Sequence, residues 1–141
     1  MAGALDDVKV LDLTWVLSGP YASMILCDLG AEVIKVERPP YGDVARTTGP
    51  HVNNESSYFF SINRGKRSIG INLATDEGRE LFLRMTEQVD VVMENFTPGT
   101  MDRLGIGYAA LAARNPRIIL SSTSGFGQTG PYRERPGYDF M

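Results

Sequence analysis

The stretch VKVLDLTWVLSGPYASMILCDLGAEVIKVE, residues 8–37, decides the fold class. Its two ends, residues 8–13 and 32–37, are short apolar segments with the length of buried strands. Between them, Pro20 suits the first position of a helix and Gly30 the position just past its end. A strand, a helix and a second strand in this order predict two parallel neighbours joined by a right-handed crossover.

The rest of the chain continues the same alternation. Thr75 and Thr97 each precede residues that suit the first turn of a helix, so both are expected to act as N-caps. Other segments are rich in Gly and Pro, and a long irregular segment inside a compact domain is usually functional or a lid. The expected strands cover residues 68–73, 89–93 and 117–121, the expected helices begin at residues 75, 98 and 108, and the expected irregular segments cover 39–57 and 124–137.

These elements predict an α/β protein with a Rossmann-like open parallel sheet and flanking helices, in one domain over residues 1–141. A composition of 43% hydrophobic and 22% charged residues is that of a folded domain. The net charge of -3 argues against a nucleic-acid partner, and the apolar runs are too short to cross a membrane. A single cysteine, Cys27, and acidic residues near the start of the chain predict a cytoplasmic protein.

Open α/β sheets bind ligands at the carboxyl ends of their strands, so the residues that follow each strand are candidate site residues. Backbone N–H groups at Ser18 and at Thr97, at the expected helix starts, could hold an anion. The loop after the first strand lacks the G-x-G-x-x-G pattern of a nicotinamide or flavin site. After the second strand, Glu37 could bind ribose hydroxyls, but the adjacent Arg38 suits a phosphorylated ribose. These residues predict a phosphate-bearing ligand.

Each candidate also has a purely structural alternative. The only histidine, His51, lies in the expected irregular segment, so no metal site is expected. The structural alternatives are a solvated strand-end cation for Arg38, a turn or helix cap for Asn95, an ion pair with Asp102 or a nearby acid for Arg103, a solvated turn at residues 63–67 for Arg64, Lys66 and Arg67, and core packing in place of adenine stacking for Trp15 and Phe96.

Six sequence motifs, in order along nearly the whole chain, resemble the family III CoA-transferases (the CaiB/BaiF family). This family includes formyl-CoA and crotonobetainyl-CoA transferases and the α-methylacyl-CoA racemases. The motifs are VLDLT at 10–14, GPYA at 19–22 with DLGAEVIKVER at 28–38, NRGKRS at 63–68, DVVMENF at 90–96 with PG at 98–99, SGFGQTGPY at 124–132, and PGYD at 136–139.

The resemblance implies that this domain binds coenzyme A as a substrate, with no permanently bound cofactor. Some family members have a lysine where this chain has Ala74, so one cationic contact is missing here. The residues that match coenzyme A-binding positions of the family are Leu17, Ser18, Arg38, Ile71, Asn72, Leu73, Ala74, Asn95, Phe96, Thr97, Arg103, Gly137, Tyr138 and Asp139.

The resemblance also implies a reaction in which coenzyme A moves from an acyl-CoA thioester to a carboxylic acid through an aspartyl-acyl anhydride. The nucleophilic aspartate of the family lies in a later motif, so we expect it beyond Met141, not at Asp139, and expect these 141 residues alone to be inactive. Racemases of the family have Gly-His-Asp where this chain has Gly137-Tyr138-Asp139, which favours transfer over racemisation. The alternatives are a racemase-like enzyme and a non-catalytic nucleotide-binding domain. The resemblance further implies an interlocked homodimer.

Overall fold

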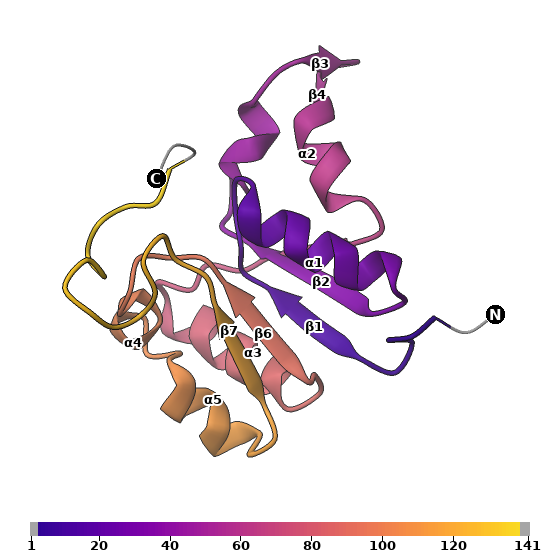
Figure 1. Cartoon of the computed structure of the whole chain (residues 1–141). Helices are drawn as coiled ribbons and strands as arrows, with labels where there is room; N and C mark the ends of the chain where they lie inside the picture. The colour runs from indigo at the N-terminus through magenta and orange to yellow at the C-terminus, as the bar shows by residue number, and fades with distance from the viewer. Residues whose placement is uncertain (1–2, 139–141) are drawn as a thin grey trace.

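In the computed structural model, which describes residues 3–138, five parallel strands form one sheet (Figure 1). The sheet order is β5-β2-β1-β6-β7, and a separate two-stranded antiparallel hairpin pairs β3 with β4. The elements are β1 (Lys9–Asp12), α1 (Ser18–Asp28), β2 (Glu32–Glu37), the 3-10 helix η1 (Val44–Thr47), β3 (His51–Val52), β4 (Glu55–Ser56), α2 (Ser57–Asn63), β5 (Arg67–Gly70), α3 (Asp76–Thr86), β6 (Val91–Glu94), α4 (Thr100–Arg103), α5 (Tyr108–Arg114) and β7 (Ile119–Ser122).

This strand order is that of a doubly wound Rossmann-like sheet. The chain moves outward from β1 to β2 and β5, then returns across the sheet to β6, on the other side of β1, and continues to β7. The direction of winding therefore reverses between β1 and β6. In open α/β sheets the ligand crevice lies at such a reversal, outside the carboxyl ends of the strands. The predicted α/β class and parallel sheet are confirmed.

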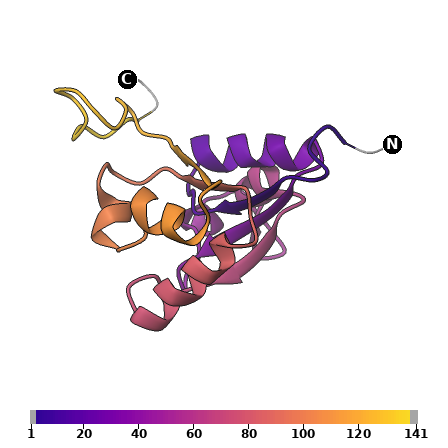
Figure 2. The same ribbon diagram turned by 90° about the horizontal axis from the view of Figure 1, so that it is seen from below.

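Helices cover both faces of the sheet, as Figure 2 shows in a view from below. On one face α1 packs over an apolar cluster of Val10, Ala31, Val33 and Met93. On the other face α3, α4 and α5 enclose the larger cluster. Its fully buried members are Leu11, Phe82, Val92, Ile106 and Leu111.

The predicted N-cap of α3 is confirmed: the hydroxyl of Thr75 accepts a hydrogen bond from the Gly78 N–H at 3.1 Å. The predicted N-cap at Thr97 is wrong, and so is the helix start at residue 98. The single-turn helix α4 begins at Thr100 after Gly99, whose positive φ of 78° ends the preceding turn. The chain therefore does not offer a helix N-terminus at Thr97 to an anion.

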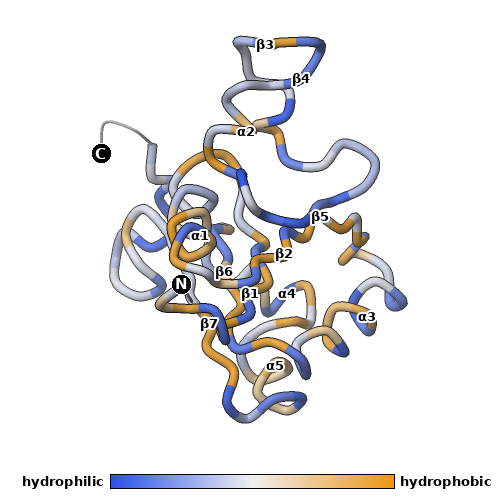
Figure 3. The backbone as a smooth tube through the Cα atoms, turned by 90° about the vertical axis from the view of Figure 1, so that its right-hand side faces the viewer, coloured by the Kyte–Doolittle hydropathy of each residue, from blue (hydrophilic) through white to orange (hydrophobic). Residues whose placement is uncertain are grey.

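Residues 39–57, which the composition predicts to be irregular, contain η1 and the β3–β4 hairpin. The seven-residue helix α2 begins at the end of this segment, and the sequence reasoning missed it. The hairpin and α2 stand at one end of the molecule, away from the sheet (Figure 3). Ser56 caps α2 by accepting the Phe59 N–H at 3.0 Å, and Phe59, Ile62 and Asn63 form its buried face. None of the helices in residues 3–138 is long and apolar enough to cross a membrane.

Candidate functional site

The loop between β1 and α1 lies at the point where the sheet reverses, and the loop after β6 holds it in place. The side-chain amide of Asn95 accepts the Trp15 N–H at 3.0 Å and donates to the Trp15 carbonyl at 2.8 Å. The Trp15 and Phe96 rings also meet edge to face, with centroids 6.3 Å apart. Asn95 therefore ties the two loops together across 80 residues of sequence.

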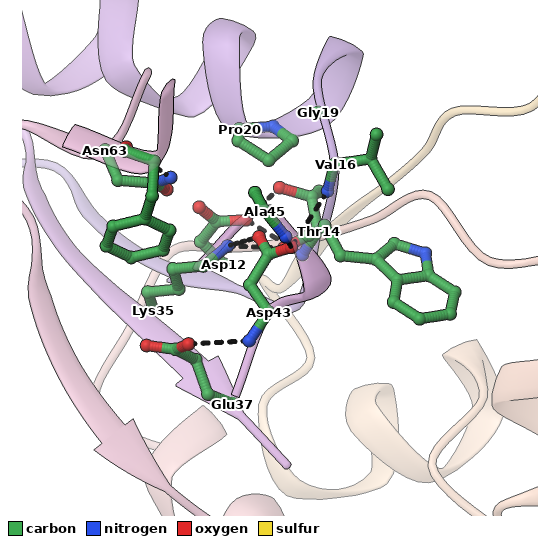
Figure 4. Close-up of polar contacts among 12 residues, drawn as sticks. Asp12, Thr14, Val16, Gly19, Pro20, Lys35, Glu37, Asp43, Ala45 and Asn63 are labelled. Atoms are coloured by element: carbon green, nitrogen blue, oxygen red, sulfur yellow. Dashed lines mark hydrogen bonds and ion pairs between the residues drawn. The ribbon is translucent and has the colours of Figure 1, made fainter. Parts of the chain in front are cut away.

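The backbone of this loop is strained at Val16, which has a φ of 69°. A β-branched residue in the left-handed region is a genuine outlier and persists only where its surroundings hold it. The Val16 N–H donates to the carboxylate Oδ1 of Asp43 at 3.1 Å, and Lys35 Nζ donates to the carbonyl of Thr14 at 2.6 Å (Figure 4). Asp43 and Lys35 form a buried ion pair at 3.0 Å.

A second buried ion pair anchors the end of β1 to α1 and to the start of β5. The Asp12 carboxylate lies 2.9 Å from Lys66 Nζ and accepts the hydroxyl proton of Ser23 at 2.6 Å. Lys66 also donates to the Pro20 carbonyl and to the side chain of Asn63. Burial lowers the pKa of the Lys66 ammonium, and the attraction of Asp12 opposes that effect. The expected solvated turn at residues 63–67 is therefore wrong for Lys66, although Arg64 and Arg67 remain at the surface.

The acid at the end of β2 is not available to a ribose. Glu37 is 7% exposed and accepts hydrogen bonds from Arg46, from the hydroxyl of Ser68 and from the Asp43 N–H at 2.8 Å. Burial opposes ionisation, but these hydrogen bonds and the Arg46 charge outweigh it and lower the pKa of Glu37 to about 2. Glu37 thus supports the segment that carries Asp43, and the neighbouring Arg38 side chain is exposed.

The loop after β6 forms the other wall of the crevice. Buried Glu94 accepts the Phe96 N–H at 2.7 Å, and burial raises the pKa of its carboxyl group. Arg103 donates to the Thr100 hydroxyl at 2.6 Å rather than pairing with Asp102, so the ion pair suggested as its structural alternative is wrong. A pocket of about 200 Å³ opens here, lined in part by Glu94, Thr97, Thr100 and Ser122.

Most of the predicted site residues lie at the carboxyl ends of the strands. Leu17, Ser18, Asn72, Ala74 and Tyr138 are exposed there or in the segments that leave them.

Other predicted residues are less available. Asn95 and Phe96 are half-buried, and Ile71 is buried in the core, so only its backbone could meet a ligand. Asp139 lies outside the described residues. In residues 3–138 no group of three or more His, Cys, Asp or Glu side chains could hold a metal ion.

Sequence reasoning missed the buried charges that support the site. Lys35 and Asp43 are separated by eight positions, and Asp12 and Lys66 by 54. The available signals were Lys35 and Asp12, charged residues inside the apolar strand segments 32–37 and 8–13, which are costly to bury unless an opposite charge pairs with them.

Comparison with known proteins identifies relatives of the whole chain. The model of the family described as "CoA-transferase family III" matches residues 5–141. The chain is 53% identical in sequence to the acetyl-CoA:oxalate CoA-transferase of Acetobacter aceti. The match covers 97% of this chain and 35% of that enzyme. The chain is 49% identical to the human succinyl-CoA:glutarate CoA-transferase over 96% of its length, which is 31% of that enzyme. The chain thus spans about a third of the length of these relatives.

The fold agrees with the same family. A solved structure of a CaiB/BaiF family protein from Brucella suis superposes with a TM-score of 0.93 at 50% identity, and the match covers 100% of this chain and 38% of that one. A second structure, of the protein Rv3272 from Mycobacterium tuberculosis, superposes with a TM-score of 0.90 at 44% identity, over 98% of this chain and 38% of that one. The chain therefore belongs to CoA-transferase family III.

Proposed function

We propose that these residues form the coenzyme A-binding part of an enzyme that transfers coenzyme A between an acyl-CoA and a carboxylic acid. The observation that carries the proposal is the position of three family motifs, which run past the carboxyl ends of β1, β2 and β6 on both sides of the reversal in the sheet. Relatives named as acetyl-CoA:oxalate and succinyl-CoA:mesaconate CoA-transferases support the same reaction class.

In this proposal the exposed arginines recognise the phosphates. Arg38 follows β2 directly, and its side chain makes no ion pair within residues 3–138. Arg103 keeps its guanidinium at the surface next to Thr97 and Thr100. A guanidinium fork matches the geometry of phosphate oxygens and strengthens the bond with its charge. The N–H groups of Ser18 and Gly19, at the start of the 11-residue helix α1, would add a further anion-binding element.

The chemistry proposed for the whole protein is acyl exchange through a carboxylate. An aspartate oxygen attacks the thioester carbonyl, the carbon–sulfur bond breaks, and the coenzyme A thiolate leaves an aspartyl-acyl anhydride. The acceptor carboxylate then displaces the donor acid from the aspartyl carbonyl and forms a second anhydride. The thiolate attacks the acceptor's carbonyl in this anhydride, which gives the new acyl-CoA and frees the aspartate. The aspartate would come from outside residues 1–141, and the exposed crevice described above would hold the coenzyme A. We also propose a cytoplasmic homodimer without a permanently bound cofactor.

Calorimetric titration with coenzyme A tests the proposal directly. We expect Arg38→Ala and Arg103→Ala each to weaken binding by about 1–3 kcal/mol, the scale of one charge-assisted hydrogen bond. If Arg38 holds the ribose phosphate, its substitution should weaken coenzyme A but not dephospho-coenzyme A. Arg117→Ala is the matched control, because Arg117 lies just before β7, at the amino ends of the strands. Binding of NAD in preference to coenzyme A would contradict the proposal.

A further inference from the structure

Three consecutive residues of the β1–α1 loop are held by side chains from three other segments. The Thr14 carbonyl accepts from Lys35 of β2, Trp15 exchanges two hydrogen bonds with Asn95 after β6, and the Val16 N–H donates to Asp43 after β2. The side chains of Trp15, Val16 and Leu17 are nevertheless between 40% and 46% exposed. The backbone is therefore fixed from beneath while the outer surface of the loop stays open.

Asp43 is built as a rigid support. It is 3% exposed, and its Oδ1 accepts both the Val16 N–H and the Ala45 N–H, at 3.1 and 2.9 Å. Its second carboxylate oxygen faces Lys35, and its own N–H is held by Glu37. Each of these partners is itself fixed, so the carboxylate has little freedom to move away from Val16.

We propose that Asp43 is a positioning residue for coenzyme A binding, which it controls by holding Val16 in the left-handed conformation. This inference rests on the proposed function. With Val16 held at a φ of 69°, the chain turns so that Leu17 is followed at once by α1. Without the hydrogen bond, the backbone of Val16 would relax to the extended or helical region that a β-branched residue prefers. The orientation of the first turn of α1 would then no longer be fixed.

The test measures coenzyme A affinity and stability for the same set of variants. Asp43→Ala removes the acceptor, and we expect an affinity loss of about tenfold or more, the equivalent of one hydrogen bond. Asp43→Asn keeps an amide oxygen for the Val16 N–H but loses the charge opposite Lys35, so it should lose stability and keep most of the affinity. In the background of Asp43→Ala, Val16→Gly should restore binding, because glycine adopts a positive φ without strain.

Asn115→Ala is the matched control. The Asn115 amide donates to the carbonyls of Thr86 and Val89 at the opposite end of the sheet, so its loss should lower stability without changing affinity. Unchanged affinity in Asp43→Ala, or equal losses in Asp43→Ala and Asp43→Asn, would overturn the inference alone. Failure of the unsubstituted protein to bind coenzyme A would instead overturn the proposed function and, with it, this inference.

If Asp43→Ala does not fold, amide hydrogen exchange in Asp43→Asn decides. Slow exchange at Val16 together with retained affinity supports the inference, since an unbonded amide in an exposed residue exchanges fast. Fast exchange at Val16 with unchanged affinity contradicts it.

Discussion

Gly19 is required at the start of α1 by close packing rather than by its backbone angles. A Cβ atom at this position would lie 2.4 Å from the Cβ of Thr14, which is itself buried against Asp12. The helix start and the end of β1 can approach so closely only because residue 19 has no side chain. The geometry of the candidate crevice therefore depends on one glycine as well as on its charged residues.

We expect Gly19→Ala to destabilise the protein by about 1–3 kcal/mol, the usual cost of overpacking a buried site. Chemical denaturation followed by circular dichroism measures this change. Gly49→Ala is the control, because an added Cβ there would meet nothing closer than His51 Nδ1 at 3.5 Å. Similar stabilities for the two variants would show that the start of α1 can shift to make room.

Glu37 makes the folding stability of the protein depend on pH in the acid range. Its pKa is lowered to about 2 in the folded state, whereas an unfolded glutamate titrates near its ordinary value. The stabilisation is therefore fully present above the unfolded pKa and is lost as the pH falls through the folded pKa. Between pH 7 and pH 3 the contribution of Glu37 should fall by roughly 2 kcal/mol.

Urea unfolding of the wild-type protein and of Glu37→Gln at the two pH values measures this. We expect a large stability difference at pH 7 and a much smaller one at pH 3, because glutamine does not titrate. A difference that stays constant with pH would mean that Glu37 has a normal pKa in the folded protein.

At the level of helices, the two threonines predicted to be N-caps differ in the structure. Thr75 caps α3, while Thr97 lies three residues before α4, and its hydroxyl shares a hydrogen bond with the hydroxyl of Thr100 instead of capping a helix. We expect Thr75→Ala to cost about 1 kcal/mol and Thr97→Ala to leave stability almost unchanged. Thermal unfolding of the two variants makes the comparison, and equal effects would contradict the cap assignment.

The central strands β1, β2 and β6 could be predicted from sequence because each lies in a short, mostly apolar run. Helix α2 could not, since only Phe59 and Ile62 mark its apolar face and seven residues give too little periodicity. Gly78 occupies the position at which a Glu would complete a capping box with Thr75, and a larger residue is excluded there because its Cβ would lie 2.0 Å from the Asn72 carbonyl oxygen. The local sequence thus predicts an element correctly where its pattern of apolar residues agrees with the way those residues pack.

At the scale of the whole molecule, the position of the candidate site followed from the order of strands and the motifs at their ends. Its supports could not be predicted, because Lys35–Asp43 and Asp12–Lys66 pair residues from separate elements. Periodicity describes which face of an element is apolar, but it does not say which buried charge meets which. Such pairs depend on how the loops cross above the sheet.

On the face of the sheet that α1 covers, β7 lies next to β6 and is left partly exposed to solvent. In the parallel register Ile119 lies beside Val91, and the Ile119 side chain is 59% exposed. On α1, Ile25 and Leu29 are 42% and 45% exposed. The strand β7 also forms the free edge of the sheet, so its unpaired backbone groups adjoin these apolar side chains. Exposed apolar residues at a sheet edge promote association.

We expect the 141-residue chain to self-associate in a concentration-dependent way, and Ile119→Lys to weaken that association by placing a charge on the open edge. Sedimentation velocity over a range of protein concentrations measures both effects. Tyr41→Ser is the control, because Tyr41 is 85% exposed but belongs to the loop after β2, at the other side of the sheet. A wild-type chain that stays monomeric throughout the range would show that this face is not an interface. Equal weakening by Tyr41→Ser would locate the contact elsewhere.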